Sequence, residues 1–374
     1  MNILFVLENY YPHIGGVEVL FKNLAEGLVR SGNNITVVTH LINGTKKFEI
    51  INGVKIYRVP CFDSRYLFTF KSILLVIKLA KKADIIQTTT FNGAFPAWLA
   101  SKITKKKSVI TIHEVWVNKW KELTDMNRFS AFIHNCLEKL IYLIRFDKYI
   151  AVSKSTRNQL RGIGIPDKKI SVVYNGVDYD LWNPQKYDKS LIRKNLCIDK
   201  DFVCVFSGRP GTSKGLEYLI KAIDIAKNKI SKLKLLAIVS KDKSYKKKYK
   251  SINKLIDMLG LNDKVILHDP VKYKDLPKYI ISADCVIVPS LAEGFGFAAA
   301  EACALNIPVV VSNITSLPEV VSGNFVLVKP KDSDSIAEGI IKVYNKQTIK
   351  KRLKRFKIED NIKGYMNVYK EIKN

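Results

Sequence analysis

The chain has 374 residues, of which 47% are hydrophobic, so it is long enough for two domains that each bury a core. Its formal net charge of +28, spread over both halves, favours an anionic partner (nucleotide phosphates, an acidic membrane surface or nucleic acid), although a solvated lysine-rich surface explains the same excess. Six cysteines without CxxC or His-rich spacing argue against a zinc site or a disulfide framework and suit a reducing cytosol.

Two segments bear on location. The N-terminal apolar run stops at Glu8 and follows no basic region, which predicts a first strand rather than a signal peptide. The longest hydrophobic stretch, Tyr66 to Ala80, contains Lys71 and Lys78 and is too short to span a bilayer. We therefore expect a cytoplasmic protein.

Strands and helices alternate along the chain, which predicts parallel sheets. In the first half, an amphipathic helix is expected from about Phe129 to Ile144, with its apolar stripe in the core. That stripe consists of Phe129, Phe132, Ile133, Cys136, Leu140 and Ile144. The strands expected in this half are Ile3–Leu7, Ile35–Thr39, Lys55–Val59, Ile85–Thr88, Val109–Ile112, Tyr149–Val152 and Ile170–Val173.

The same alternation restarts after a polar stretch from Asp178 to Ser190, which is the expected linker. The strands expected beyond it are Phe202–Ser207, Leu235–Val239, Val265–Leu267, Val286–Val288, Val309–Val311 and Phe325–Val328. The basic segment from about Lys346 is expected to be helical, with Tyr365 and Tyr369 one turn apart. Two Rossmann-like sheets in tandem follow from this pattern.

Residues 286–312 carry the most informative pattern. A buried strand leads into the glycine-rich turn Glu293–Gly296, which lets backbone N–H groups approach a ligand, and then into a small-residue helix containing Glu301. A carboxylate in so apolar a helix is costly unless it is hydrogen-bonded, although a solvent-facing Glu is the simpler alternative. Glu293 and Glu301 are eight positions apart, about two helical turns, so both can face one crevice at the carboxyl ends of parallel strands.

Other candidate residues also follow expected strands. Gly15 and Gly16 precede a helix and can bind an anion, or form a plain turn. Arg209 and Lys214 lie in a strand-to-helix turn with glycines, where the two cations can clamp a diphosphate; an exposed basic loop is the alternative. His113 ends a strand and is expected to point into a crevice rather than the core. The residues from Asn175 to Asp178 follow another expected strand and form a turn signature, which is either part of the site or purely structural.

Four strings together resemble the family 4 retaining glycosyltransferases, in the order and spacing of that family and over essentially the whole chain. They are IGGVE, VYNGVDYDLWNP, GRPGTSKGLEYLIKAI and PSLAEGFGFAAAEACALNIPVVVS, of which the Glu-x7-Glu spacing in the last is the most specific. The resemblance implies the α/β GT-B fold, two Rossmann-like domains facing each other across a deep cleft. Residues 1–186 would form the acceptor domain, 187–354 the nucleotide-sugar domain, and a C-terminal helix at about 355–374 would pack back on the first.

The resemblance also implies roles. Arg209 and Lys214 would hold the donor diphosphate and offset charge on the leaving group, Glu301 would accept from the ribose hydroxyls, and His113 would contact the transferred sugar. Glu293 and the backbone after it would hold the donor sugar. Glu319 matches a position near the donor. The implied catalytic residues are His113, Arg209, Lys214 and Glu293, and the implied donor-binding residues are Gly15, Gly16, Arg209, Lys214, Val271, Glu293, Gly294, Phe295, Gly296 and Glu301.

For the reaction, the resemblance implies retention of the anomeric configuration by a front-face route, driven by positioning and by cationic stabilisation of the leaving group. No metal or cofactor is expected, because the nucleotide-sugar is itself the substrate. The expected partners are that donor and a saccharide or lipid-linked acceptor, with no nucleic acid. The basic, apolar region Tyr66–Lys82 is expected to rest on an anionic membrane at the inner face.

The chain departs from the family pattern at Glu114, at Thr315 to Leu317 and at Asp269-Pro270, which bears on the identity of the sugar and base. Two other classes of protein are alternatives to a glycosyltransferase. Gly294-x-Gly296-x-x-Ala299 fits the fingerprint of an NAD-dependent oxidoreductase, but the next strand ends in Ser312-Asn313 rather than in an acidic residue. A nucleic-acid-binding protein rests on charge alone. The pair Asp178-x-Asp180 imitates a metal-binding motif, and we interpret it as incidental.

Overall fold

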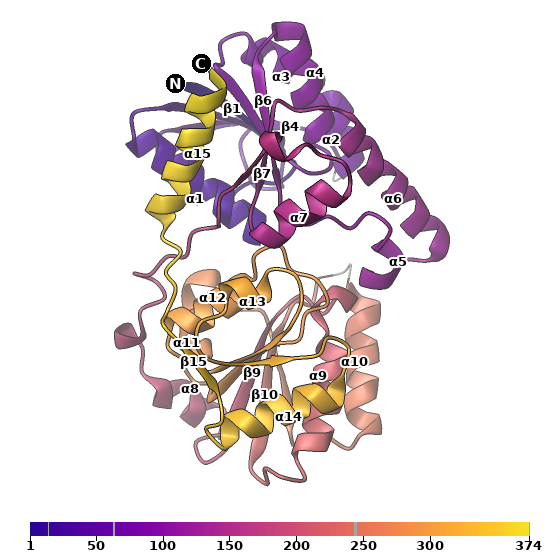
Figure 1. Ribbon diagram of the computed structural model, residues 1–374, viewed down its shortest axis with the longest axis vertical. Coiled ribbons are helices and arrows are strands. Elements are labelled where there is room, and N and C mark those ends of the chain that lie inside the picture. Colours follow the sequence, from indigo (N-terminus) through magenta and orange to yellow (C-terminus); the bar gives the residue numbers. More distant parts are fainter. Residues whose placement is uncertain (14, 63, 243–244, 374) are drawn as a thin grey trace. The chain divides into compact units, whose positions relative to one another are not determined.

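The computed structural model describes residues 1–13, 15–62, 64–242 and 245–373. They form two compact units, each a parallel-dominated sheet with helices on both faces (Figure 1). The first unit contains Met1–Asn118, Phe129–Gly176 and the residues from Phe356 onward, and the second contains Lys119–Arg128 and Val177–Arg355. The first unit thus ends at Gly176 rather than at residue 186, so the whole of the expected linker, Asp178 to Ser190, belongs to the second unit.

The first unit has an eight-stranded sheet in the order β3-β4-β2-β1-β5-β6-β7-β8. Every strand expected there is present. The added strand β3 pairs antiparallel with β4 through the two-residue turn Asn52-Gly53, in which both residues have positive φ, a strong hairpin signal in the sequence. The strands are β1 Asn2–Val6, β2 Asn34–His40, β3 Phe48–Ile51, β4 Val54–Val59, β5 Ile85–Thr89, β6 Lys107–Ile112, β7 Lys148–Ala151 and β8 Ile170–Val172.

The C-terminal helix α15 packs beside α1 on this unit (Figure 1). Its two tyrosines are buried, and their hydroxyls reach polar side chains of the sheet: Tyr369 donates to Gln87 Oε1 at 3.0 Å, and Tyr365 lies 2.9 Å from Thr111 Oγ1. The helices of the unit are α1 Gly16–Arg30, α2 Arg65–Lys71, α3 Ile73–Ala80, α4 Ala94–Thr104, α6 Arg128–Leu143, α7 Lys154–Gly162 and α15 Ile358–Lys373, with the 3-10 helix η1 Asp167–Lys169.

Helix α6 has the expected amphipathic pattern, but the prediction that its apolar stripe is core is wrong. Phe129, Phe132, Ile133 and Leu140 are exposed. The inward side instead carries Glu138, a buried carboxylate that accepts hydrogen bonds from the backbone N–H of Trp116 at 2.9 Å and from the Tyr142 hydroxyl at 3.4 Å. The buried carboxylate therefore has hydrogen-bond partners on the inward side, while most of the apolar stripe is exposed.

The second unit has a seven-stranded sheet in the order β11-β10-β9-β12-β13-β14-β15. The edge strand β15 was not expected, because the basic segment from about Lys346 was predicted to be helical; this segment is a strand that pairs antiparallel with β14, and helix α15 begins only at Ile358. The strands are β9 Phe202–Gly208, β10 Leu233–Val239, β11 Val265–His268, β12 Cys285–Val288, β13 Val309–Ser312, β14 Gly323–Val328 and β15 Ile349–Lys351.

Helices cover this sheet around a core in which Leu219 and Ile223 of α9 pack with Ile336 and Ile340 of α14. The helices are α5 Trp120–Leu123, α8 Lys189–Asn195, α9 Leu216–Ala226, α10 Lys246–Met258, α11 Leu276–Ile280, α12 Phe297–Ala304, α13 Leu317–Val320 and α14 Ser333–Tyr344, with the 3-10 helices η2 Pro184–Lys186, η3 Thr212–Lys214 and η5 Tyr273–Asp275. In neither unit is any helix of the described chain long and apolar enough to cross a membrane.

Strand order identifies where each sheet can bind a ligand. In the first unit the chain reverses its direction across the sheet between β1 and β5, and in the second between β9 and β12. Open parallel sheets bind ligands in the crevice that forms at the carboxyl ends of strands at such a reversal. The loops after β1, β9 and β12 contain most of the residues that the sequence singled out.

Candidate active site

At the reversal of the second sheet, Lys214 and Glu293 meet. Lys214 ends the turn after β9, Glu293 follows β12, and the lysine Nζ lies 2.6 Å from the carboxylate Oε1. The same oxygen accepts a hydrogen bond from Ser290 Oγ at 2.8 Å. Both charged side chains are largely buried, which strengthens their interaction relative to a surface ion pair. The structure therefore brings a cation and a carboxylate together at the carboxyl edge of adjacent strands.

The loop after β13 holds Glu293 in place. Glu293 N–H donates to Thr315 Oγ1 at 3.1 Å, and Ser316 Oγ donates to the Glu293 carbonyl at 2.9 Å. These hydroxyls come from the stretch that departs from the family pattern, and no local pattern of residues predicts that they support Glu293. Their nearness in space arises because β12 and β13 are neighbours.

Glu301 is buried inside α12 and has its own partners. Tyr273 on η5 donates its hydroxyl proton to Glu301 Oε1 at 2.7 Å, and the indole N–H of Trp182 donates to the Tyr273 oxygen at 3.1 Å. Burial raises the pKa of Glu301 to about 7, although the hydrogen bond from Tyr273 opposes this shift. The sequence analysis predicts neither supporting residue: Trp182 lies in the expected linker, and Tyr273 lies on η5, far from Glu301 in the sequence.

Gly296 begins helix α12 with a φ of +92°, a conformation that side chains other than glycine rarely adopt. A Cβ there would also lie 2.7 Å from Leu317 Cδ2. Gly294 and Phe295 precede it and are buried, with the Phe295 ring edge-to-face against Phe297. Because its ring packs into the protein, Phe295 can offer a ligand only its backbone.

Arg209 is exposed after β9 and forms no ion pair with a described carboxylate, unlike Lys214. Val271 is partly buried in the loop after β11. In that same loop the Asp269 carboxylate pairs with Lys241. Glu319 lies on α13, where its backbone carbonyl accepts a hydrogen bond from Lys354 Nζ.

The first unit holds a separate group of candidate residues. His113 follows β6, and its Nε2 is buried without a hydrogen-bond partner among the described residues. Burial lowers the pKa of His113 to about 4, although the charge of Glu18 opposes this shift, so the imidazole is neutral at pH 7. His113 also stacks edge-to-face on Phe21 of α1, at 6.3 Å between ring centroids.

Glu18, in the first turn of α1, is the last residue of the IGGVE string, and the sequence predicts no role for it. Its Oε1 lies 3.2 Å from His13 Nδ1. Burial acts to raise the pKa of Glu18, yet the hydrogen bond from His13, a backbone hydrogen bond and the charge of protonated His13 bring that pKa below its ordinary value. Gly15 caps α1 in extended conformation, and a Cβ there would lie 2.4 Å from Glu18 Oε2. The flexible Glu18 side chain would have to shift to admit a methyl group at Gly15, and Gly16 is the first helical residue.

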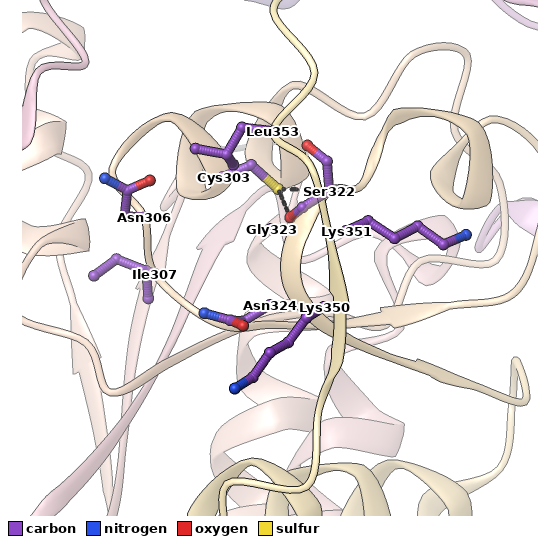
Figure 2. Close-up of a pocket in the computed structure, with 9 residues that line it drawn as sticks. All are labelled: Cys303, Asn306, Ile307, Ser322, Gly323, Asn324, Lys350, Lys351 and Leu353. Carbon is purple, nitrogen blue, oxygen red and sulfur yellow. Dashed lines mark hydrogen bonds between the residues drawn. The ribbon is translucent and has the colours of Figure 1, made fainter.

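The recess in Figure 2 contains none of the predicted site residues. It is lined by Ile307 before β13, by Gly323 at the start of β14 and by Lys350 of β15, with Cys303 Sγ bonded to the backbone of Ser322. It therefore lies at the amino ends of β13 and β14 and beside the antiparallel strand β15, at the edge opposite the crevice.

The carboxylates of Asp178 and Asp180 are both engaged within the second unit. Asp178 accepts hydrogen bonds from the backbone N–H groups of Asp180 and Leu181, each at 3.0 Å, and Asp180 pairs with Lys186. Across the described ranges, no group of three or more His, Cys, Asp or Glu side chains is arranged to hold a metal ion.

Comparison with known proteins identifies the family. The protein-family model described as Glycosyltransferase Family 4 matches residues 14–181, and the family model described as Glycosyl transferases group 1 matches residues 188–360. An uncharacterized glycosyltransferase of Methanocaldococcus jannaschii is 31% identical over 99% of this chain and 98% of its own length. The chain belongs to the family 4 glycosyltransferases. The NAD-dependent oxidoreductase and the nucleic-acid-binding protein gain no support.

More distant relatives and solved structures agree with the assignment of this chain to the glycosyltransferases. The GPI3 subunit of phosphatidylinositol N-acetylglucosaminyltransferase from Saccharomyces cerevisiae is 24% identical, covering 94% of this chain and 81% of that protein. The crystal structure of Anabaena HepE with UDP and glucose has a TM-score of 0.77 and 21% identity, covering 99% of this chain and 100% of that one. The expected α/β GT-B fold, with its two Rossmann-like sheets, is confirmed.

Proposed function

We propose that this glycosyltransferase moves a sugar, with retention of anomeric configuration, from a nucleoside diphosphate sugar to a saccharide or lipid-linked acceptor, without a metal ion. One observation carries the proposal: the Lys214–Glu293 pair lies at the reversal of the second sheet, at the carboxyl ends of its strands. Such a crevice suits a ligand with both an anionic diphosphate and neutral hydroxyl groups. A nucleoside diphosphate sugar has this chemistry.

In this proposal the cations act on the diphosphate. The bond between the anomeric carbon and the diphosphate oxygen breaks while the acceptor oxygen bonds the same face of that carbon, and the acceptor proton leaves with the diphosphate. Negative charge grows on the departing oxygen, where Arg209 and Lys214 would offset it. Glu293 would position both Lys214 and the sugar, because its carboxylate pairs with the lysine while its backbone is fixed by Thr315 and Ser316.

Glu301 would accept hydrogen bonds from the ribose hydroxyls in its ionised form, which such donors favour. His113 would bind the transferred sugar through its buried Nε2, which needs a hydrogen-bond partner. Because its pKa is about 4, His113 would act as a neutral hydrogen-bonding group and not as a general acid. Gly15 and Gly16 would present the start of α1 to the donor phosphate.

The relatives suggest which substrates to test first. The Anabaena structure contains UDP and glucose, so uridine donors come first. The name of the yeast relative specifies phosphatidylinositol, which supports a lipid acceptor for this chain as well. Both remain proposals for this enzyme.

The test is a thermal-shift screen of the full chain with UDP-, GDP- and ADP-sugars, followed by assay of sugar transfer and donor hydrolysis. A true donor at one hundred times its Kd should stabilise its unit by about 2.7 kcal/mol. Lys214→Ala should remove turnover, whereas Lys221→Ala, an exposed lysine on α9, should leave it unchanged. The proposal fails if no nucleotide-sugar raises the Tm and none is consumed.

A further inference from the structure

The first unit exposes large apolar side chains on two helical segments. On α2 and α3, Phe70 is 67% exposed and Leu74 is 81% exposed. On α6, Phe129 is 73% exposed and Leu143 is 72% exposed, with Phe132 and Leu140 between them at helical spacing. We call the surface formed by these six residues the α2–α6 face. Contiguous exposed apolar surface of this kind marks a binding surface.

The two parts of this face adjoin each other. The hydroxyl of Tyr66 on α2 lies 3.2 Å from Nε2 of His134 on α6, and the two helices run near each other in Figure 1. Tyr66 is four positions before Phe70, and His134 is next to Ile133 in the apolar stripe of α6. The contact therefore places the α2 part of the face next to the α6 part.

The exposed charges on the helices of this face are of one sign. Lys71 and Lys78 are exposed on α2 and α3, and Lys139 is exposed on α6. In these three helices, whose residues the structure describes completely, the only carboxylate is Glu138, which is buried. Lys71 Nζ also lies 4.4 Å from the centre of the exposed Phe62 ring, so a cation and an apolar group are presented together.

We propose that the α2–α6 face docks on the surface of an anionic lipid bilayer. Amphipathic helices that lie in the interface insert their aromatic and aliphatic side chains while basic residues reach the headgroups. A second copy of the chain fits this face poorly. In a symmetric dimer the basic face of one copy would contact the basic face of the other, and like charges repel. The inference rests on the proposed function in one respect, the lipid-linked acceptor that the bilayer would present.

The test is co-sedimentation of the full chain with vesicles of phosphatidylcholine, with and without phosphatidylglycerol, at low and high salt. The wild type should bind the anionic vesicles, and added salt should weaken that binding. The double variant Phe70→Ser with Leu74→Ser should bind at least about tenfold more weakly, since two exposed apolar side chains are lost. The matched control is Met258→Ser, an equally exposed apolar residue of the second unit, which should bind like wild type.

Charge provides an independent readout. Lys78→Glu with Lys139→Glu, at two of the exposed lysines of this face, should reduce binding to anionic vesicles and leave any binding to phosphatidylcholine unchanged. Equal binding by wild type and the Phe70–Leu74 variant overturns the proposal, and so does a dimer in sedimentation velocity that this variant abolishes. The nucleotide-sugar thermal shift, measured on the same variants, reports on the donor site alone, so failure of vesicle binding can be told apart from failure of the proposed function.

Discussion

The buried carboxyl group of Glu301 should make the stability of the second unit fall as pH rises. Its pKa in the folded chain is about 7 because of burial, against an ordinary value of 4.5. Between these values the folded state holds a proton that the unfolded state has lost, so this contribution is fully present below pH 4.5 and is lost as pH rises through 7. At about 1.36 kcal/mol for each pH unit, the loss is about 3 kcal/mol.

Glu301→Gln isolates this effect, because the amide keeps the shape of the side chain and does not titrate. We expect the free energy of unfolding in urea, wild type minus variant, to fall by about 3 kcal/mol between pH 4.5 and pH 8. His113 makes the opposite contribution: its lowered pKa stabilises the fold above pH 6.5, and this is lost as pH falls towards 4. It is present in both proteins and cancels in the difference.

The control is Glu338→Gln, an exposed residue on α14. Its difference from wild type should stay nearly constant over the same pH range. A constant difference for Glu301→Gln as well would refute the reasoning, because Glu301 would then titrate as an ordinary exposed carboxyl group. If ribose hydroxyls bind the ionised form, nucleotide affinity of the wild type should also rise with pH, by up to about tenfold per unit below pH 7.

Three further substitutions test the arrangement of the site. Lys214→Ala should lower kcat by about a hundredfold or more in the protein that remains folded, while the unpaired Glu293 also lowers Tm, and retained turnover would exclude the action of Lys214 on the leaving group. Tyr273→Phe removes the hydrogen bond to Glu301; nucleotide titrations at pH 6 and 8 should show the larger loss of affinity at pH 6, because the pKa of Glu301 rises further. Gly15→Ala places a methyl group against Glu18 and should weaken donor binding in calorimetry while far-UV circular dichroism stays unchanged; unchanged affinity would remove the start of α1 from the donor site.

Local sequence predicted the sheets because their strands are buried on both faces. Runs such as Val286–Val288 and Val309–Val311 contain no polar alternation and can lie only in the interior of a parallel sheet. The edges were harder to predict. Phe48–Ile51 and Ile349–Lys351 are short and largely exposed, so apolar runs do not reveal them. The Asn52-Gly53 turn would have revealed the first, whereas the second pairs through residues far away in the sequence.

The α6 stripe shows a different limit. Helical periodicity predicted which residues share a face, and the structure confirms that Phe129, Phe132 and Leu140 do. Periodicity does not predict what covers that face. On its inward side this helix instead carries Glu138, whose carboxylate accepts one hydrogen bond from Tyr142 of the same helix and one from the distant backbone N–H of Trp116, and only the second contact is tertiary. A hydrophobic stripe at helical spacing thus predicts a helix, but it does not by itself predict that the stripe is buried.

The carboxylates Glu293 and Glu301 illustrate the same limit within the site. Sequence spacing predicted that both could face one crevice, but the folded chain gives them different environments. Glu293 is ionically paired with Lys214, whereas Glu301 meets only the neutral hydroxyl of Tyr273, supported by Trp182. Burial raises the pKa of Glu301 to about 7, and the hydrogen bond from Tyr273 limits that rise. Two identical side chains, eight positions apart, are therefore placed in different electrostatic environments by partners that are distant in the sequence, which the spacing of the two residues alone does not predict.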